Sequence, residues 1–151
     1  MSSGVRRARG CPGVRIPAVA TMTRTRVVGP VALWALRLAG VMFPLAVFGQ
    51  AIFAGLFVTG DLGMLNMHQV NSAVVLFTAV LWVLASIVLV VADKAPGRLI
   101  VFGVVAIVIT VAQMAFGGSR VLWLHIPLGV GMFTMGLRLL AAAFGYGKER
   151  S

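Results

Sequence analysis

Four long apolar runs, almost without charged side chains, constrain this 151-residue chain more than any other feature. They cover about 18 to 25 residues each, at positions 38–58, 68–92, 99–116 and 121–144. A helix rises about 1.5 Å per residue, so runs of this length cross the roughly 30 Å hydrocarbon core of a bilayer. The runs show no strict alternation and exceed the length of barrel strands. The sequence therefore predicts an all-α integral membrane protein with four transmembrane helices.

Short polar segments separate the runs, and short loops make neighbouring helices antiparallel. The predicted architecture is an up-down four-helix bundle over residues 31–146. Residues 1–30 lack periodicity and are predicted to form a disordered basic arm, and residues 147–151 a short tail. Met22 is an alternative start just before the first run, which would make residues 1–21 a mis-assigned beginning.

The basic residues predict how the helices are oriented. Of the 13 Lys and Arg residues, all but Arg120 lie before the first run, between the second and third, or towards the chain end. Cytoplasmic segments of membrane proteins carry this excess, so both termini and the middle loop are expected in the cytoplasm of a cell with an inner (plasma) membrane. The net charge of +10 is thus explained by topology and by contact with the lipid bilayer, and nucleic-acid binding is not expected.

The two histidines of the chain occupy matching places. His68 and His125 each lie near the start of a long apolar run, and each is the fourth residue of a Leu-x-x-His pattern. Gln50 and Gln113 occupy corresponding places in the preceding runs. The chain is therefore expected to consist of two similar hairpins, with both imidazoles facing each other in the outer leaflet.

Paired imidazoles in a bundle core are suited to a haem, because imidazole is a common axial ligand of haem iron. Small residues stand one helical turn beyond each histidine, Ser72 in one half and Gly129 in the other, and would leave room for the macrocycle. Arg120 could meet a haem propionate at the wet rim. No Cys-x-x-Cys-His motif is present, so the expected cofactor is one non-covalent haem b between the second and fourth helices.

Alternatives to haem ligation remain open at these residues. The histidines could form a hydrogen-bonded structural pair, or they could serve another metal or a proton relay. Gln50 and Gln113 could simply bond between helices. The alternative function is a non-catalytic membrane protein that supports or assembles a larger complex. A proton-coupled transporter is disfavoured, because the acidic residues belong to loops and the tail: Asp61, Asp93 and Glu149.

The pattern Gln113-Met-Ala-Phe-Gly117, then a turn with Arg120, then His125 opening a helix, resembles one four-helix half of a haem A synthase. It is also similar to small uncharacterised four-helix bacterial membrane proteins with histidines at these two places. The resemblance covers residues 38–144. It implies that His68 and His125 are the axial pair of one haem near the outer face.

The chain departs from that family in three ways. The catalytic half of the family has a glutamate three residues before its first histidine, where this chain has Leu65. The cysteine pair of many members is missing, since Cys11 is the only cysteine. A second four-helix half is also missing, although a homodimer would restore eight helices. The resemblance therefore implies a single-haem electron-transfer or haem-handling role, with a quinone or redox protein as partner, rather than an enzyme that acts alone.

Overall fold

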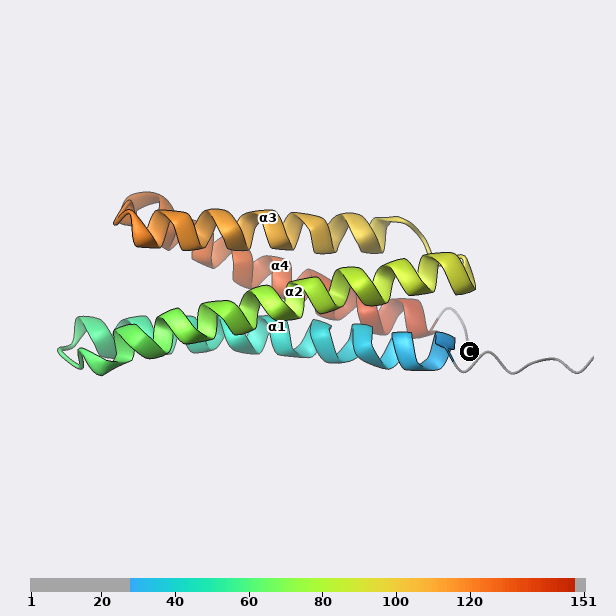
Figure 1. The fold of residues 1–151 in the computed structure, drawn as a ribbon, viewed down its shortest axis with the longest axis horizontal. Coiled ribbons are helices and arrows are strands. Elements are labelled where there is room, and N and C mark those ends of the chain that lie inside the picture. The colour runs from blue at the N-terminus through green and yellow to red at the C-terminus, as the bar shows by residue number, and fades with distance from the viewer. Residues whose placement is uncertain (1–27, 149–151) are drawn as a thin grey trace, which may run out of the picture.

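The structure, a computed structural model, describes residues 28–148, and this part of the chain folds into four helices (Figure 1). They are α1 (Val28–Val58), α2 (Gly63–Asp93), α3 (Arg98–Gly118) and α4 (Leu122–Lys148). Each is long and apolar enough to cross a membrane, which confirms the prediction of four such helices. Residues 1–27, which include the alternative start and most of the predicted arm, lie outside the described residues. So do residues 149–151 of the predicted tail.

Two helices begin earlier than the apolar runs indicate. α1 starts at Val28 and includes Pro30 in its first turn. The N–H groups of the first turn have no acceptor within the helix, so a proline there costs no helical hydrogen bond. α2 starts at Gly63, five residues before the second run, and Asp61 Oδ1 accepts a hydrogen bond from Gly63 N at 3.1 Å. That bond satisfies one of the free donors at a helix start, so the polar residues before His68 are helical as well.

The helices form a ring in which each packs against two others. α1 packs against α2 and α4, and α3 packs against the same two helices. α2 and α4 therefore lie across one diagonal of the bundle. Consecutive helices run in opposite directions, as in an up-down bundle, and both ends of the described chain lie at the same end (Figure 1).

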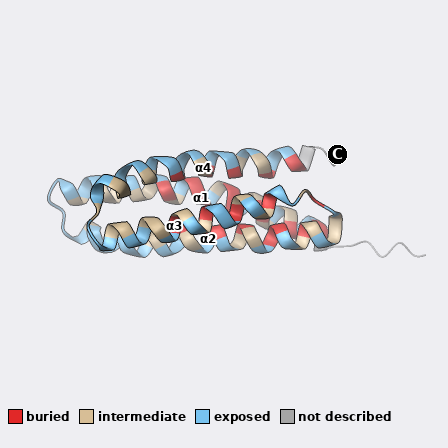
Figure 2. Ribbon diagram, turned by 90° about the horizontal axis from the view of Figure 1, so that it is seen from above, coloured by how far each residue is buried: buried red, intermediate tan, exposed pale blue. Residues whose placement is uncertain are grey.

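We divide the bundle into two halves. The tip half contains residues 48–74 and 111–131, which include the α1–α2 and α3–α4 turns; the base half contains residues 28–47, 75–110 and 132–148. All the buried side chains of the described residues belong to the base half (Figure 2). The largest fully buried ones are Trp82, Phe43, Leu36, Leu89, Leu99 and Leu139.

Trp82 is the centre of the base half. Its ring is fully buried, and its Nε1 donates a hydrogen bond to the Leu99 carbonyl of α3 at 2.8 Å. Two glycines make room for it: a Cβ atom at Gly40 or Gly103 would lie 3.1 Å or 2.5 Å from the indole ring. Small residues allow helices in membranes to approach closely, so one large ring joins α1, α2 and α3 here.

Candidate functional site

The two histidines meet inside the tip half. His68 is the sixth residue of α2 and His125 the fourth of α4, and their ring centroids are 6.1 Å apart with the planes inclined by 55°. Since α2 and α4 lie across a diagonal, the rings approach each other through the interior of the bundle. Both side chains are half-buried.

Each imidazole is held by a backbone carbonyl of the preceding helix. His68 Nδ1 lies 3.1 Å from the Gln50 oxygen, and His125 Nδ1 lies 2.9 Å from the Gln113 oxygen. A carbonyl oxygen only accepts hydrogen bonds, so Nδ1 carries the proton in both rings. With its proton on Nδ1, a neutral imidazole carries its lone pair on Nε2, on the far side of the ring from this bond.

The two glutamines act mainly through their backbone. Gln113 Nε2 also donates to the His125 carbonyl at 2.8 Å, so these two residues bond to each other twice across α3 and α4. The side-chain oxygens of Gln50 and Gln113 are buried and accept no hydrogen bond within the described chain. They remain acceptors for a donor that a ligand or water would bring.

The small residues have different roles. Ser72 Oγ donates to the Gln69 carbonyl of its own helix at 2.6 Å. A Cβ atom at Gly129 would lie 3.1 Å from Gln113 Nε2, so this glycine accommodates the glutamine side chain. Gly117, which was not among the predicted site residues, accommodates His125: a Cβ atom there would lie 2.8 Å from His125 Cε1. Its position one turn after Gln113 is the sequence signal for this role.

The carbonyl acceptors were also missed by the sequence analysis. Besides those of Gln50 and Gln113, the Ala46 carbonyl accepts a hydrogen bond from Asn71 Nδ2 at 2.8 Å, about one turn from the His68 bond. The sequence signal that pairs each histidine with its carbonyl is the number of residues that separates each of them from the turn. Gln50 and His68 are each nine residues from position 59, and Gln113 and His125 are each six residues from position 119. Residues at equal distances from the turn of an antiparallel hairpin lie at the same level.

Arg120 lies in the α3–α4 turn and is exposed. Its backbone has a φ of 59°, in the left-handed region that closes such turns, and its N–H donates to the Gly117 carbonyl at 3.1 Å. Its side chain makes no hydrogen bond or ion pair with the described residues. The structure thus leaves Arg120 at the rim of the tip half and does not bring it to the histidines.

The donor set of the site consists of two imidazoles. Among residues 28–148, no three or more His, Cys, Asp or Glu side chains gather closely enough to hold a metal ion by themselves. Two imidazoles whose Nε2 atoms make no hydrogen bond with the described residues can instead supply two ligands of a metal whose other ligands come from a macrocycle.

The chain was compared with protein families, curated proteins and solved structures. No family model, curated protein or solved structure matches it.

Proposed function

We propose that this chain is a multi-pass protein of the inner (plasma) membrane, with both termini in the cytoplasm. In this proposal the tip half binds one haem b between α2 and α4, with the Nε2 atoms of His68 and His125 as axial ligands of the iron. The role is electron transfer or haem handling, with a quinone or a redox protein as partner. The observation that carries the proposal is the approach of two imidazoles whose Nδ1 atoms both donate to carbonyls.

The separation of the rings supports joint ligation. A metal–imidazole nitrogen bond is about 2 Å long, and the centroid lies about 1 Å behind the nitrogen, so two axial imidazoles have centroids about 6 Å apart. The observed distance is 6.1 Å.

The hydrogen bonds of the rings support the same assignment. A histidine that binds a metal almost always donates its other ring N–H to a carbonyl, a carboxylate or water, which orients the ring and selects the tautomer. Both His68 and His125 have such a partner, on α1 and α3 respectively. A purely structural histidine needs neither this tautomer nor a second ring opposite it.

The looser packing of the tip half is compatible with a bound group between α2 and α4. Side chains that face the bundle axis are fully buried in the base half, whereas no residue at 48–74 or 111–131 is buried. The helices around the histidines are therefore packed less tightly than those of the base half. Arg120 at the rim would bind a propionate, and the amide oxygens of Gln50 and Gln113 would make the surroundings polar.

The arrangement also indicates the kind of chemistry. Bound haem iron supplies one-electron transfer. His68 and His125 would hold the group from its two sides and would supply no further reactive side chain. The chain's own residues orient and hold the group through α1 and α3, which suits an electron carrier or a haem-handling protein rather than an enzyme that acts alone.

The test is the absorption spectrum of the purified protein, oxidised and reduced, from cells supplied with haem. Wild type is expected to show a sharp Soret band and a reduced α-band. His68→Ala and His125→Ala are each expected to lose about nine-tenths of the bound haem, because one axial ligand is removed. Asn71→Ala is the matched control: it removes the neighbouring bond to the Ala46 carbonyl and leaves both imidazoles, so haem content stays unchanged. Colourless wild-type protein, or full haem content in the histidine variants, contradicts the proposal.

The alternative is a non-catalytic membrane protein that supports a larger complex. It is favoured by the fact that each histidine already joins two helices, α2 to α1 and α4 to α3. In that case the protein is colourless, and the only effect of His68→Ala is a loss of about 0.6–1.7 kcal/mol in the free energy of unfolding.

A further inference from the structure

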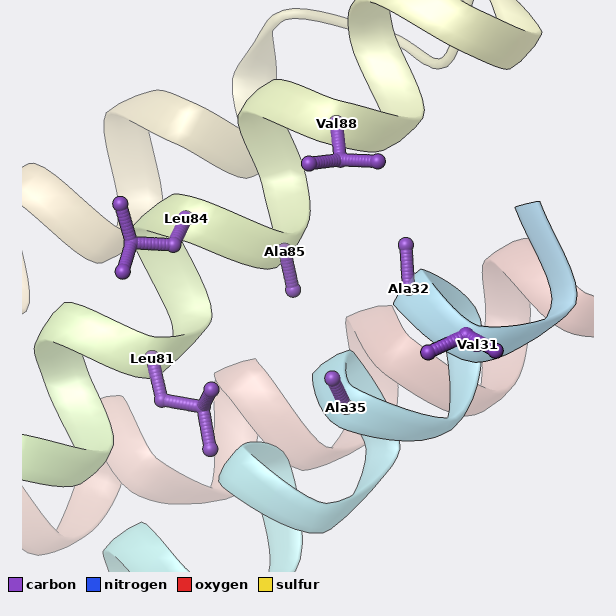
Figure 3. Close-up of a pocket in the computed structure, with 7 residues that line it drawn as sticks. All are labelled: Val31, Ala32, Ala35, Leu81, Leu84, Ala85 and Val88. Carbon is purple, nitrogen blue, oxygen red and sulfur yellow. The ribbon is translucent and has the colours of Figure 1, made fainter. Parts of the chain in front are cut away.

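Two apolar grooves run along the outside of the bundle. One lies between α1 and α2 in the base half and is lined only by valine, alanine and leucine (Figure 3). The other lies between α1 and α4, and we call it the α1–α4 groove. It is lined by Val41, Pro44, Leu45, Phe48, Phe133, Leu137 and Leu140. The rings of Phe48 and Phe133, with centroids 6.4 Å apart, lie at its tip-half end.

The α1–α4 groove has an arginine at its base-half end. Val41, Pro44 and Phe48 follow Arg37 by four, seven and eleven residues, which places all four on one face of α1. The Arg37 guanidinium carbon lies 5.4 Å from the ring centroid of Phe144, one turn beyond the last groove residue of α4. The positive charge of Arg37 therefore lies in line with the groove, just beyond its base-half end.

Arg37 is only partly satisfied by the protein. Its guanidinium carbon lies 5.2 Å from the Trp34 ring and 5.4 Å from the Phe144 ring, so two aromatic faces hold it. Its Nε is buried and makes no hydrogen bond within the described chain. A guanidinium presents donors in a planar fork that matches two oxygens of a phosphate.

The depth of Arg37 suits a lipid headgroup. α1 has 31 residues and is about 46 Å long, so a position centred on a hydrocarbon core of roughly 30 Å would leave about 8 Å of helix outside it at each end. Arg37 stands nine residues, about 14 Å, from the start of α1, and so about 6 Å inside the core. A long arginine side chain spans that distance to the headgroup level.

We propose that the α1–α4 groove binds an anionic glycerophospholipid. One acyl chain lies along the groove from Phe144 to Phe48, and the lipid phosphate binds the Arg37 guanidinium. The apolar lining matches the chain, and the single charge at the end of the groove matches the headgroup. This inference rests on the proposed membrane insertion and is independent of haem.

The test is native mass spectrometry of the purified protein, equilibrated in detergent with equal amounts of phosphatidylglycerol and phosphatidylcholine. Both lipids carry a phosphate, but the choline cation of phosphatidylcholine offsets the phosphate charge and repels the Arg37 guanidinium. Wild type is therefore expected to retain phosphatidylglycerol at least about tenfold over phosphatidylcholine, a difference of about 1.4 kcal/mol. Arg37→Gln is expected to remove the preference. Leu137→Trp, which fills the groove and keeps Arg37, is expected to lower the retention of phosphatidylglycerol by about the same factor.

Arg138→Gln is the matched control, because it removes the same charge from an exposed site on α4. It should leave the lipid ratio within about twofold of wild type. Excess inorganic phosphate should not displace the lipid, because it lacks the acyl chain. Equal retention of both lipids by wild type, an unchanged ratio in Arg37→Gln, or an unaffected Leu137→Trp variant would each overturn the proposal. A haem-free but membrane-bound protein would contradict only the haem assignment, whereas recovery in the soluble fraction would contradict membrane insertion.

Discussion

The base half and the tip half are built from the same four helices but are held together differently. In the base half, fully buried apolar side chains such as Trp82, Phe43 and Leu139 interdigitate near the bundle axis. In the tip half no residue is buried as a whole, and the helices are joined by side-chain hydrogen bonds to backbone carbonyls. These bonds involve His68, Asn71, Gln113 and His125.

This difference indicates a division of roles along the bundle. Close packing supplies most of the attraction between helices in a membrane, because lipid is as apolar as leucine. Single interhelical hydrogen bonds contribute less, about 0.6 kcal/mol on average. The base half can therefore hold the fold, while the tip half keeps polar groups in fixed positions around its axis.

The largest expected effect is on packing in the base half. Trp82→Ala is expected to lower the free energy of unfolding by about 3–5 kcal/mol, because it leaves a cavity and removes the bond to the Leu99 carbonyl. Trp123→Ala, the same change at an exposed site of the tip half, is expected to cost less than about 1 kcal/mol. Denaturant titration in detergent, followed by circular dichroism, measures both. Equal losses would abolish the distinction between the halves.

A smaller loss in the free energy of unfolding is expected for a substitution at Gly117, which accommodates the His125 ring. Gly117→Ala places a Cβ atom 2.8 Å from His125 Cε1 and 3.0 Å from Nδ1, so the ring must move and its bond to the Gln113 carbonyl is disturbed. We expect a loss of about 1–3 kcal/mol in unfolding free energy and a weaker Soret band.

The neighbouring Gly118→Ala is the control for this change, since a Cβ atom there meets nothing within 4 Å. It should preserve the spectrum and change the free energy of unfolding by no more than about 0.5–1 kcal/mol, in the stabilising direction, as for other helical glycines. Identical spectra of the two variants would show that Gly117 does not position the ring.

The smallest effect is expected for the glutamine side chains. Gln113→Leu removes the bond from Nε2 to the His125 carbonyl and should lower the free energy of unfolding by about 0.6–1.7 kcal/mol. The Gln50 side-chain oxygen accepts no bond within the described residues, so Gln50→Leu should be neutral or slightly stabilising. Denaturant titration in detergent, followed by circular dichroism, compares Gln113→Leu with Gln50→Leu. A larger loss for Gln50→Leu would mean that the two glutamines do not differ as the structure indicates.

Most of the fold was predictable from the sequence, whereas only part of the candidate site was. Apolar runs and short polar breaks predict the four helices because both signals are local. The starts of α1 and α2 were less certain, since Asp61 and Pro30 allow helix to form in segments that are not apolar. The histidines were found through their matching places. Gly117 was not, because its position one turn after Gln113 does not show how closely α3 approaches the His125 ring.

The order of side chains along the chain by itself determines that this protein forms long apolar helices, and that two imidazoles stand near the start of the second and fourth. Hydrophobic periodicity and charge act within a helix, so they can be read without knowing its neighbours. Only the tertiary structure decided that the two rings lie 6.1 Å apart, with their Nδ1 atoms on carbonyls of α1 and α3. It also placed Arg37 between Trp34 and Phe144, because distances between helices follow from packing that no single segment encodes.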